Sequence, residues 1–215
     1  MPTGLTFREK MFGPFAFGCT DPGDGAAVGR RTSWDLTLHG TVTIDDVAAF
    51  VTGPQHLGNL SGEIELPGIG DRIPFRDGVF KLFVPSREPG LTLMVYEAPL
   101  RVNGVDHYLA GRKNVRDDFR LDLWPDTTTL EVRLHRGDNA TGPVAGSGVI
   151  RLSVLELFAL LASARTKHAG SPAESALAVA AFGRLFLRNL VDSYLLRPTA
   201  YLRTRHGAAE EEVQE

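Results

Sequence analysis

Four aspartates, Asp117, Asp118, Asp122 and Asp126, lie close together in segment 111–132, GRKNVRDDFRLDLWPDTTTLEV. Crowded carboxylates can raise one another's pKa and act as acid or base, or bind calcium where about six oxygens converge. The spacing fits no EF-hand loop, and aspartates also cap turns by accepting backbone N–H bonds. We therefore interpret the segment as a capped connection between two strands, with Asp117 or Asp118 fixing the turn.

Two other kinds of pattern could indicate a cofactor or a nucleophile. The stretch GDGAAVG at 23–29 is similar to a dinucleotide-binding glycine loop, but a Gly/Pro-rich stretch precedes it and a strand-like run follows. We interpret it as a flexible loop. The sequence has no G-x-S-x-G nucleophile motif, and its one cysteine, Cys19, has no histidine beside it. Neither pattern predicts a catalytic nucleophile or a cofactor.

The six histidines are scattered, with no H-x-H or H-x-x-x-H pair, so the sequence predicts no metal site. His107 shares its side of a predicted strand with Leu109. A polar side chain among inward apolar ones often orients a ligand in a barrel. The alternative is a buried histidine bonded to a backbone carbonyl.

Hydrophobic periodicity predicts a mainly β protein. Apolar and polar residues alternate from Trp34 to Ile44, and further short strand-like runs follow up to Leu152. Asn103-Gly104 is a two-residue hairpin signal. After Ile150 the period becomes helical, with two capped helices. The prediction is an antiparallel barrel or strongly curved sheet, lipocalin-like, with two C-terminal helices packed on it.

Composition divides the chain into three parts. Residues 1–31 are rich in Gly and Pro and are predicted to be irregular. Residues 32–196 are predicted to form one domain, and the charged tail 197–215 is predicted to be disordered.

The net charge of −3 gives no basic field for nucleic acid. Without a signal-peptide pattern or an uninterrupted apolar span, we expect a cytoplasmic protein with no membrane span.

The order of several segments is similar to a known domain. DGVFKLFV, MVYEAPLRVNGVDHYLAGRKNVRDD, DLWPDTTTLEVRL, GSGVIRLSVLELFALLAS and FGRLFLRNLVDSY follow one another within the range from Trp34 to Tyr194. Together they resemble a β-rich accessory domain associated with some cholesterol-oxidase-like proteins of the GMC oxidoreductase family. The resemblance implies a module that works near sterol-like compounds. It implies no catalytic residue, and the flavin-binding part is absent.

These observations lead to one function hypothesis and two alternatives. The hypothesis is that a barrel cavity binds a bulky hydrophobic molecule of sterol, fatty acyl or polyketide type, without a cofactor. One alternative is a cofactor-free cyclase or isomerase that holds its substrate in a reactive conformation. The other is a scaffold that binds a partner oxidoreductase or a second copy through its first C-terminal helix. The ligand-binding candidates are Trp34, Tyr96, Tyr108, Lys113 and Trp124, and the acid/base candidates are His107, Asp118 and Tyr108.

Overall fold

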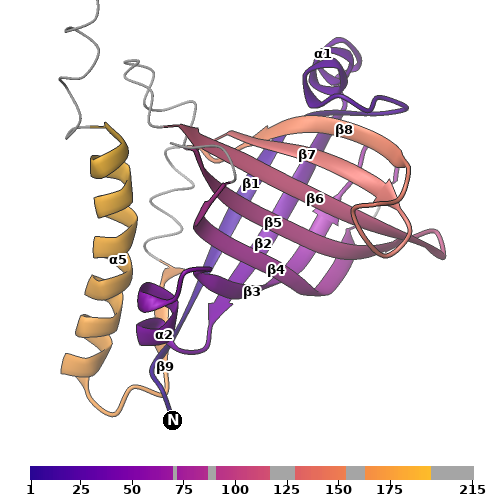
Figure 1. The fold of residues 1–215 in the computed structure, drawn as a ribbon. Helices are drawn as coiled ribbons and strands as arrows, with labels where there is room; N and C mark the ends of the chain where they lie inside the picture. The colour runs from indigo at the N-terminus through magenta and orange to yellow at the C-terminus, as the bar shows by residue number, and fades with distance from the viewer. Residues whose placement is uncertain (70–71, 87–90, 117–128, 154–162, 195–215) are drawn as a thin grey trace, which may run out of the picture.

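The structure is a computed structural model that describes residues 1–69, 72–86, 91–116, 129–153 and 163–194. Its main feature is a closed barrel of eight antiparallel strands (Figure 1). The strands are β1 (Gly4–Phe17), β2 (Asp35–Ile44), β3 (Leu57–Glu65), β4 (Ile73–Pro85), β5 (Leu91–Val102), β6 (Val105–Arg116), β7 (Thr129–Arg136) and β8 (Val144–Arg151). The prediction of a lipocalin-like antiparallel barrel is confirmed.

Alternation of apolar and polar residues explains why these segments form strands with one buried face. In β2, Leu36, Leu38, Val42 and Ile44 are almost completely buried, while the threonines and the histidine on the other face are partly exposed. The other strands follow the same rule, so inward side chains from all eight strands pack together in one core. The interior of the barrel is therefore lined mainly by aliphatic and aromatic side chains.

Consecutive strands pair in order, and β1 closes the barrel by pairing with both β2 and β8. The β5–β6 hairpin turns at Asn103 and Gly104, whose φ angles of 50° and 79° match the predicted two-residue turn. β8 contacts only the second half of β1, from Phe12 onward. Near its start, β1 instead pairs with the short strand β9 (Arg165–Lys167), which lies outside the barrel.

Helix α1 (Pro22–Thr32) lies against the outer face of the barrel beside β8 and β1 (Figure 1). The Asp21 carboxylate begins the helix by accepting hydrogen bonds from the backbone N–H groups of Gly23 and Asp24. Gly25 and Gly29, one turn apart, bring the helix backbone close to the strands: a Cβ on Gly25 would lie 2.1 Å from the Ser147 carbonyl oxygen. Close approach therefore requires glycine at this face.

Two further helices lie at the opposite end of the barrel. Helix α2 (Val47–Thr52) connects β2 to β3, and the longer helix α5 (Pro172–Tyr194) stands beside it (Figure 1). Phe182 of α5 is buried against Phe50 of α2 and Phe7 of β1, with ring centroids 6.1 and 5.4 Å apart. No helix in the described parts of the chain is long and apolar enough to cross a membrane.

The structure corrects one prediction about the chain's organisation. Residues 1–31 are not irregular, because most of them form β1 and α1, so the domain begins near Gly4 rather than at residue 32. The 23–29 stretch is helical rather than a flexible loop. Glycine and proline obscured both elements: Gly13 and Pro14 lie within β1, and three glycines lie within α1. The first predicted C-terminal helix falls mostly on residues 154–162, and this segment and the tail 197–215 lie outside the described residues.

Because α1 lies close to β8, replacing a glycine with alanine is expected to have opposite effects on protein stability in α1 and in α5. A Cβ added at Gly183 of α5 would have no heavy atom within 4 Å, so Gly183→Ala is expected to stabilise the protein by about 1 kcal/mol through helix propensity. Gly25→Ala is expected to destabilise it by about 1–3 kcal/mol because the methyl group meets backbone. Urea denaturation measures both, and stabilisation by Gly25→Ala would contradict this packing.

Candidate functional site

Three polar side chains meet inside the otherwise apolar barrel. Glu9 of β1 and Lys113 of β6 are buried, with exposed fractions of 6% and 3%, and Tyr96 of β5 is buried beside them. Buried ionisable groups in an apolar interior are rare unless they are paired or functional. We call Glu9, Tyr96 and Lys113 the interior polar cluster.

Strand parity places Glu9 in the barrel. It lies between Phe7 and Met11 on the inward face of β1, at a position that its neighbours predict to be apolar. Its register partner on β2 is Gly40, where a Cβ would lie 3.3 Å from Glu9 Cγ and 3.5 Å from Glu9 Oε1. The missing side chain at Gly40 therefore leaves room for the carboxyl group.

Tyr96 reaches Glu9 across the barrel. Its hydroxyl donates a hydrogen bond of 3.2 Å to Glu9 Oε2. β1 and β5 are separated by three strands in either direction around the barrel, so this bond connects opposite walls. Phe80 of the neighbouring strand packs edge-on against the Tyr96 ring at a centroid distance of 5.2 Å, which fixes the ring's direction.

Lys113 enters the same interior from β6. It has the same parity as Leu109 and Gly111, and its register partner on β5 is Met94. The next inward residue on β5 is Tyr96, which faces Gly111. Lys113 and Tyr96 are thus diagonal neighbours on adjacent strands, and the ammonium group interacts electrostatically with Glu9.

Burial dominates the electrostatics of this cluster. It raises the pKa of Glu9 to about 7, although the Lys113 charge and the Tyr96 hydrogen bond both act to lower it. Burial likewise lowers the pKa of Lys113 to about 8 against the attraction of Glu9, and it raises the pKa of Tyr96 well above its ordinary value. Tyr96 is therefore a permanent donor, while Glu9 and Lys113 both exchange protons near neutral pH.

One oxygen of Glu9 has no hydrogen-bond partner among the described residues. Oε2 accepts from Tyr96, but Oε1 is buried and unpaired. A buried acceptor without a partner costs roughly 1–3 kcal/mol, more if it is charged. Such an atom in a native structure often marks a place where a water molecule, an ion or a ligand binds.

An aromatic layer joins this cluster to the helical end of the barrel. Phe80, which contacts Tyr96, also contacts Phe7 and Phe50 at centroid distances of 6.0 and 6.5 Å. Both of these rings contact Phe182 of α5. The interior polar cluster is therefore surrounded by apolar and aromatic side chains on the side of the barrel where α2 and α5 pack.

The structure places the predicted ligand-binding residues in different surroundings. Tyr96 and Lys113 lie in the interior polar cluster, although Lys113 was predicted to lie in a connecting loop and instead lies on β6. Trp34 precedes β2 next to the end of α1 and is 42% exposed. Tyr108 lies on the outward face, where its hydroxyl donates to Glu97 Oε2 at 2.9 Å. Trp124 lies outside the described residues.

Of the predicted acid/base residues, the two that the structure describes, His107 and Tyr108, do not lie in the cluster. His107 has inward parity but lies at the start of β6, six residues or about 20 Å along the strand from Lys113. Its Nδ1 donates to the Val105 carbonyl oxygen at 3.1 Å. Tyr108 faces outward, where burial and the Glu97 bond raise its pKa to about 12. Asp118 lies outside the described residues.

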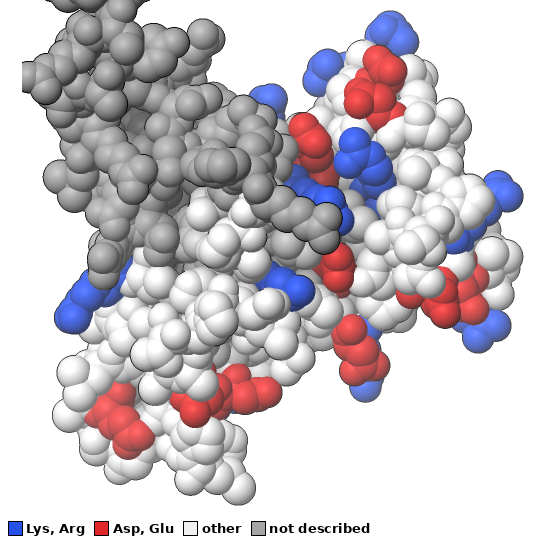
Figure 2. Space-filling model, viewed as in Figure 1, with Lys and Arg blue, Asp and Glu red and all other residues white. Residues whose placement is uncertain are grey.

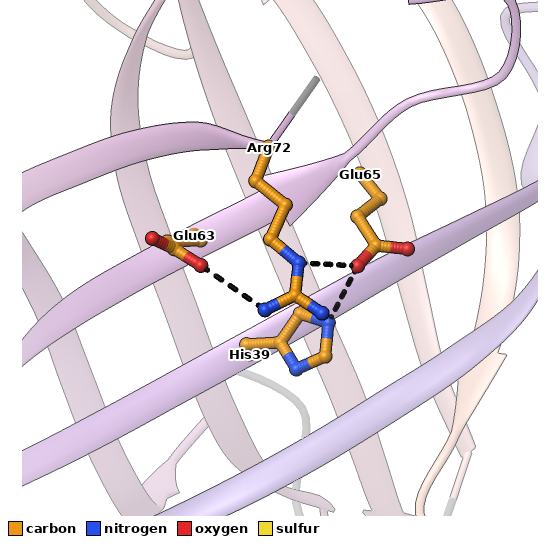
Figure 3. Close-up of polar contacts among 4 residues, drawn as sticks. All are labelled: His39, Glu63, Glu65 and Arg72. Atoms are coloured by element: carbon orange, nitrogen blue, oxygen red, sulfur yellow. Dashed lines mark hydrogen bonds and ion pairs between the residues drawn. The ribbon is translucent and has the colours of Figure 1, made fainter. Parts of the chain in front are cut away.

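A second polar group lies on the outside of the barrel. Arg72 connects Glu63 and Glu65 at 3.4 and 2.8 Å, and His39 Nε2 shares the same Glu65 oxygen at 3.0 Å (Figure 3). The hydrogen bond from His39, with smaller contributions from Arg72, lowers the pKa of Glu65. His39, Glu63 and Glu65 lie on the polar faces of β2 and β3, and Arg72 immediately precedes β4. All four side chains are at least partly exposed, so we assign them a structural role on the surface.

Two kinds of second site find no support among the described residues: a patch of one charge on the face drawn in Figure 2, and a metal centre. Acidic and basic side chains are interspersed over the described part of the face in Figure 2. Within the described residues, no three His, Cys, Asp or Glu side chains are grouped to hold a metal ion. Comparisons with protein-family models, curated proteins and solved structures found no match. The interior polar cluster is therefore the strongest candidate site.

Glu9 is the residue that sequence reasoning missed. The alternation of Leu5, Phe7, Glu9 and Met11 with polar residues is a strand signal, and it places a carboxylate at an apolar position. The Gly/Pro-rich composition of the first 31 residues hid this alternation. The signal that could have identified Glu9 is a carboxylate at an inward-facing position of a predicted strand.

The pKa of Glu9 depends on Lys113, whose positive charge is the largest influence that lowers it. Lys113→Met is therefore expected to raise the Glu9 pKa further above about 7. Carbon-13 NMR titration of the glutamate carboxyl signals measures this value, with Glu9→Gln identifying the resonance. Lys81→Met, on the outward face of β4, is the control and should leave it unchanged. An unchanged or lower Glu9 pKa in Lys113→Met would show that the two groups do not interact.

The raised pKa of Glu9 in the Lys113→Met variant also predicts that the stability of this variant depends on pH. In Lys113→Met, the folded protein keeps Glu9 protonated above the unfolded value of 4.5, so it binds more protons than the unfolded chain. The stabilising contribution is complete below pH 4.5 and is lost as the pH rises through the folded pKa. Urea denaturation from about pH 4.5 to 8 should show a steeper decline in unfolding free energy for Lys113→Met than for Lys113→Met/Glu9→Gln. Identical declines would contradict the burial of an ionisable Glu9.

Proposed function

We propose that the barrel binds a hydrophobic small molecule that carries a hydrogen-bond donor, and that this donor bonds to Glu9 Oε1. The unpaired oxygen of a buried carboxyl group in an apolar interior is the observation that carries the proposal. Binding sites for small molecules combine mainly apolar walls with a few polar groups that fix orientation. Glu9, Tyr96 and Lys113 within the barrel core have this composition.

The energetics favour a donor over a purely apolar ligand. A hydroxyl or amine of the ligand would satisfy Oε1, and hydrogen bonds to charged groups contribute roughly 1.5–3 kcal/mol. Tyr96 holds the other oxygen, so the carboxyl group is already oriented before binding. Sterols, hydroxylated acyl chains and polyketides all combine a hydroxyl with a large apolar body. The resemblance to an accessory domain of cholesterol-oxidase-like proteins adds support for the sterol class.

A cofactor-free isomerase or cyclase is the second candidate, and the pKa of Glu9 favours it. A general acid or base works best with a pKa near the operating pH, and burial raises the pKa of Glu9 to about 7. Tyr96 would hold the carboxyl group in place as a permanent donor. In this candidate Glu9 takes the acid/base role that the sequence predicted for His107, Tyr108 and Asp118. The scaffold alternative depends on a helix in 154–162, outside the described residues.

The binding proposal predicts a preference between two matched probes. Octan-1-ol donates a hydrogen bond and its methyl ether, 1-methoxyoctane, does not. We expect octan-1-ol to bind roughly 10- to 100-fold more tightly, the equivalent of one charge-assisted hydrogen bond. Isothermal titration calorimetry measures the two affinities, and native mass spectrometry of the purified protein tests for a retained hydroxylated molecule.

Glu9→Leu should abolish the preference for the alcohol while retaining affinity for the ether. Glu97→Leu is the matched control, because Glu97 lies on the same barrel with its carboxylate on the outward face. It should leave both affinities unchanged. Equal binding of the two probes by the wild-type protein, or a preference that survives Glu9→Leu, would overturn the assignment of Glu9 as the ligand's partner.

A further inference from the structure

Lys113 gives the barrel interior a nucleophile that reversible binding does not require. Its side chain is buried to an exposed fraction of 3% on a regular strand, among Met94, Gly111 and Tyr96. An amine held in an apolar site loses its proton more readily than an amine in water, and the neutral amine attacks carbonyl carbon. Glu9 on β1, a carboxyl group that can donate or accept a proton, interacts electrostatically with Lys113.

We propose that Lys113 forms an imine with an aldehyde or ketone group carried by an apolar ligand. This inference rests on the proposed function, because the ligand must first enter the interior around Glu9. It narrows the ligand class to apolar molecules that carry an aldehyde or ketone group in addition to the hydrogen-bond donor that bonds to Glu9.

Imine formation requires only the ligand's carbonyl group, the Lys113 amine and the Glu9 carboxyl group. The neutral Lys113 nitrogen attacks the carbonyl carbon and forms a C–N bond, while the C=O π electrons move to oxygen and the nitrogen transfers a proton to that oxygen. Glu9 in its acid form then protonates the hydroxyl of the carbinolamine, which leaves as water as the C=N bond forms. The Glu9 carboxylate takes back the proton from the iminium nitrogen. An amine and a carbonyl compound become an imine and water, with no oxidant or reductant.

The surroundings of Lys113 favour both formation and retention of the imine. The pKa of about 8 leaves a far larger neutral fraction at neutral pH than an exposed lysine has. Apolar walls limit the water that would hydrolyse the product. The chain's other three lysines, Lys10, Lys81 and Lys167, are exposed or lie on outward strand positions and have no such environment.

Reductive trapping of a probe aldehyde tests the proposal on the full chain. The protein is incubated with octanal and cyanoborohydride at about pH 7.5, and the modified lysines are located by peptide mass mapping. We expect Lys113 to be modified roughly tenfold or more faster than Lys167, as expected for a desolvated amine. Excess octan-1-ol should protect Lys113 without protecting the surface lysines. Lys113→Met should lose the fast modification, and Glu9→Gln should slow it while octan-1-ol still protects.

The outcomes separate this inference from the binding proposal. Binding of octan-1-ol without fast modification of Lys113 overturns the imine and leaves the binding proposal standing. Modification confined to Lys10, Lys81 and Lys167 also overturns it. Fast modification of Lys113 that octan-1-ol does not block supports the imine and contradicts a shared binding site. Absence of both binding and fast modification overturns both proposals.

Discussion

The desolvation of Glu9 and Lys113 inside the barrel dominates the physical chemistry of this protein. Removing a carboxylate and an ammonium group from water costs several kcal/mol each, and their attraction recovers that cost only with good geometry and further hydrogen bonds. Here the attraction does not fully compensate, because both pKa values move toward the neutral forms. The barrel therefore keeps two groups that exchange protons near neutral pH in an interior that apolar residues would fill more stably.

The rest of the fold is arranged around this polar interior. Closure of the barrel through β1 joins β8 to β2 and places Glu9 opposite Tyr96. Gly40 leaves space for the carboxyl group, and Phe80 fixes the tyrosine ring. α2 and α5 add an aromatic layer at one end, while α1 covers the outer face near the other. One oxygen of the buried Glu9 carboxyl group is bonded to Tyr96, and the other has no hydrogen-bond partner among the described residues. This arrangement suits the binding of a ligand that donates a hydrogen bond.

The sequence predicted the barrel because its signals were local. Alternation in β2 and the Asn103-Gly104 turn depend on neighbouring residues, and both were confirmed. The prediction for the start of the chain was wrong because glycine and proline lowered the apparent strand and helix propensity of β1 and α1, whose tertiary contacts compensate. The cluster itself could be predicted only in part. Tyr96 and Lys113 were candidates, but their meeting with Glu9 depends on pairing around the whole barrel, which no local spacing encodes.

A crystal structure of the protein with octan-1-ol tests the central claim most directly. We expect the alkyl chain among the inward side chains of the barrel, with the hydroxyl oxygen within hydrogen-bond distance of Glu9 Oε1 and the Tyr96 bond to Oε2 retained. An alcohol bound only on the outer surface, or a protein side chain bonded to Oε1 with no alcohol in the interior, would contradict the assignment of Glu9 as the ligand's partner.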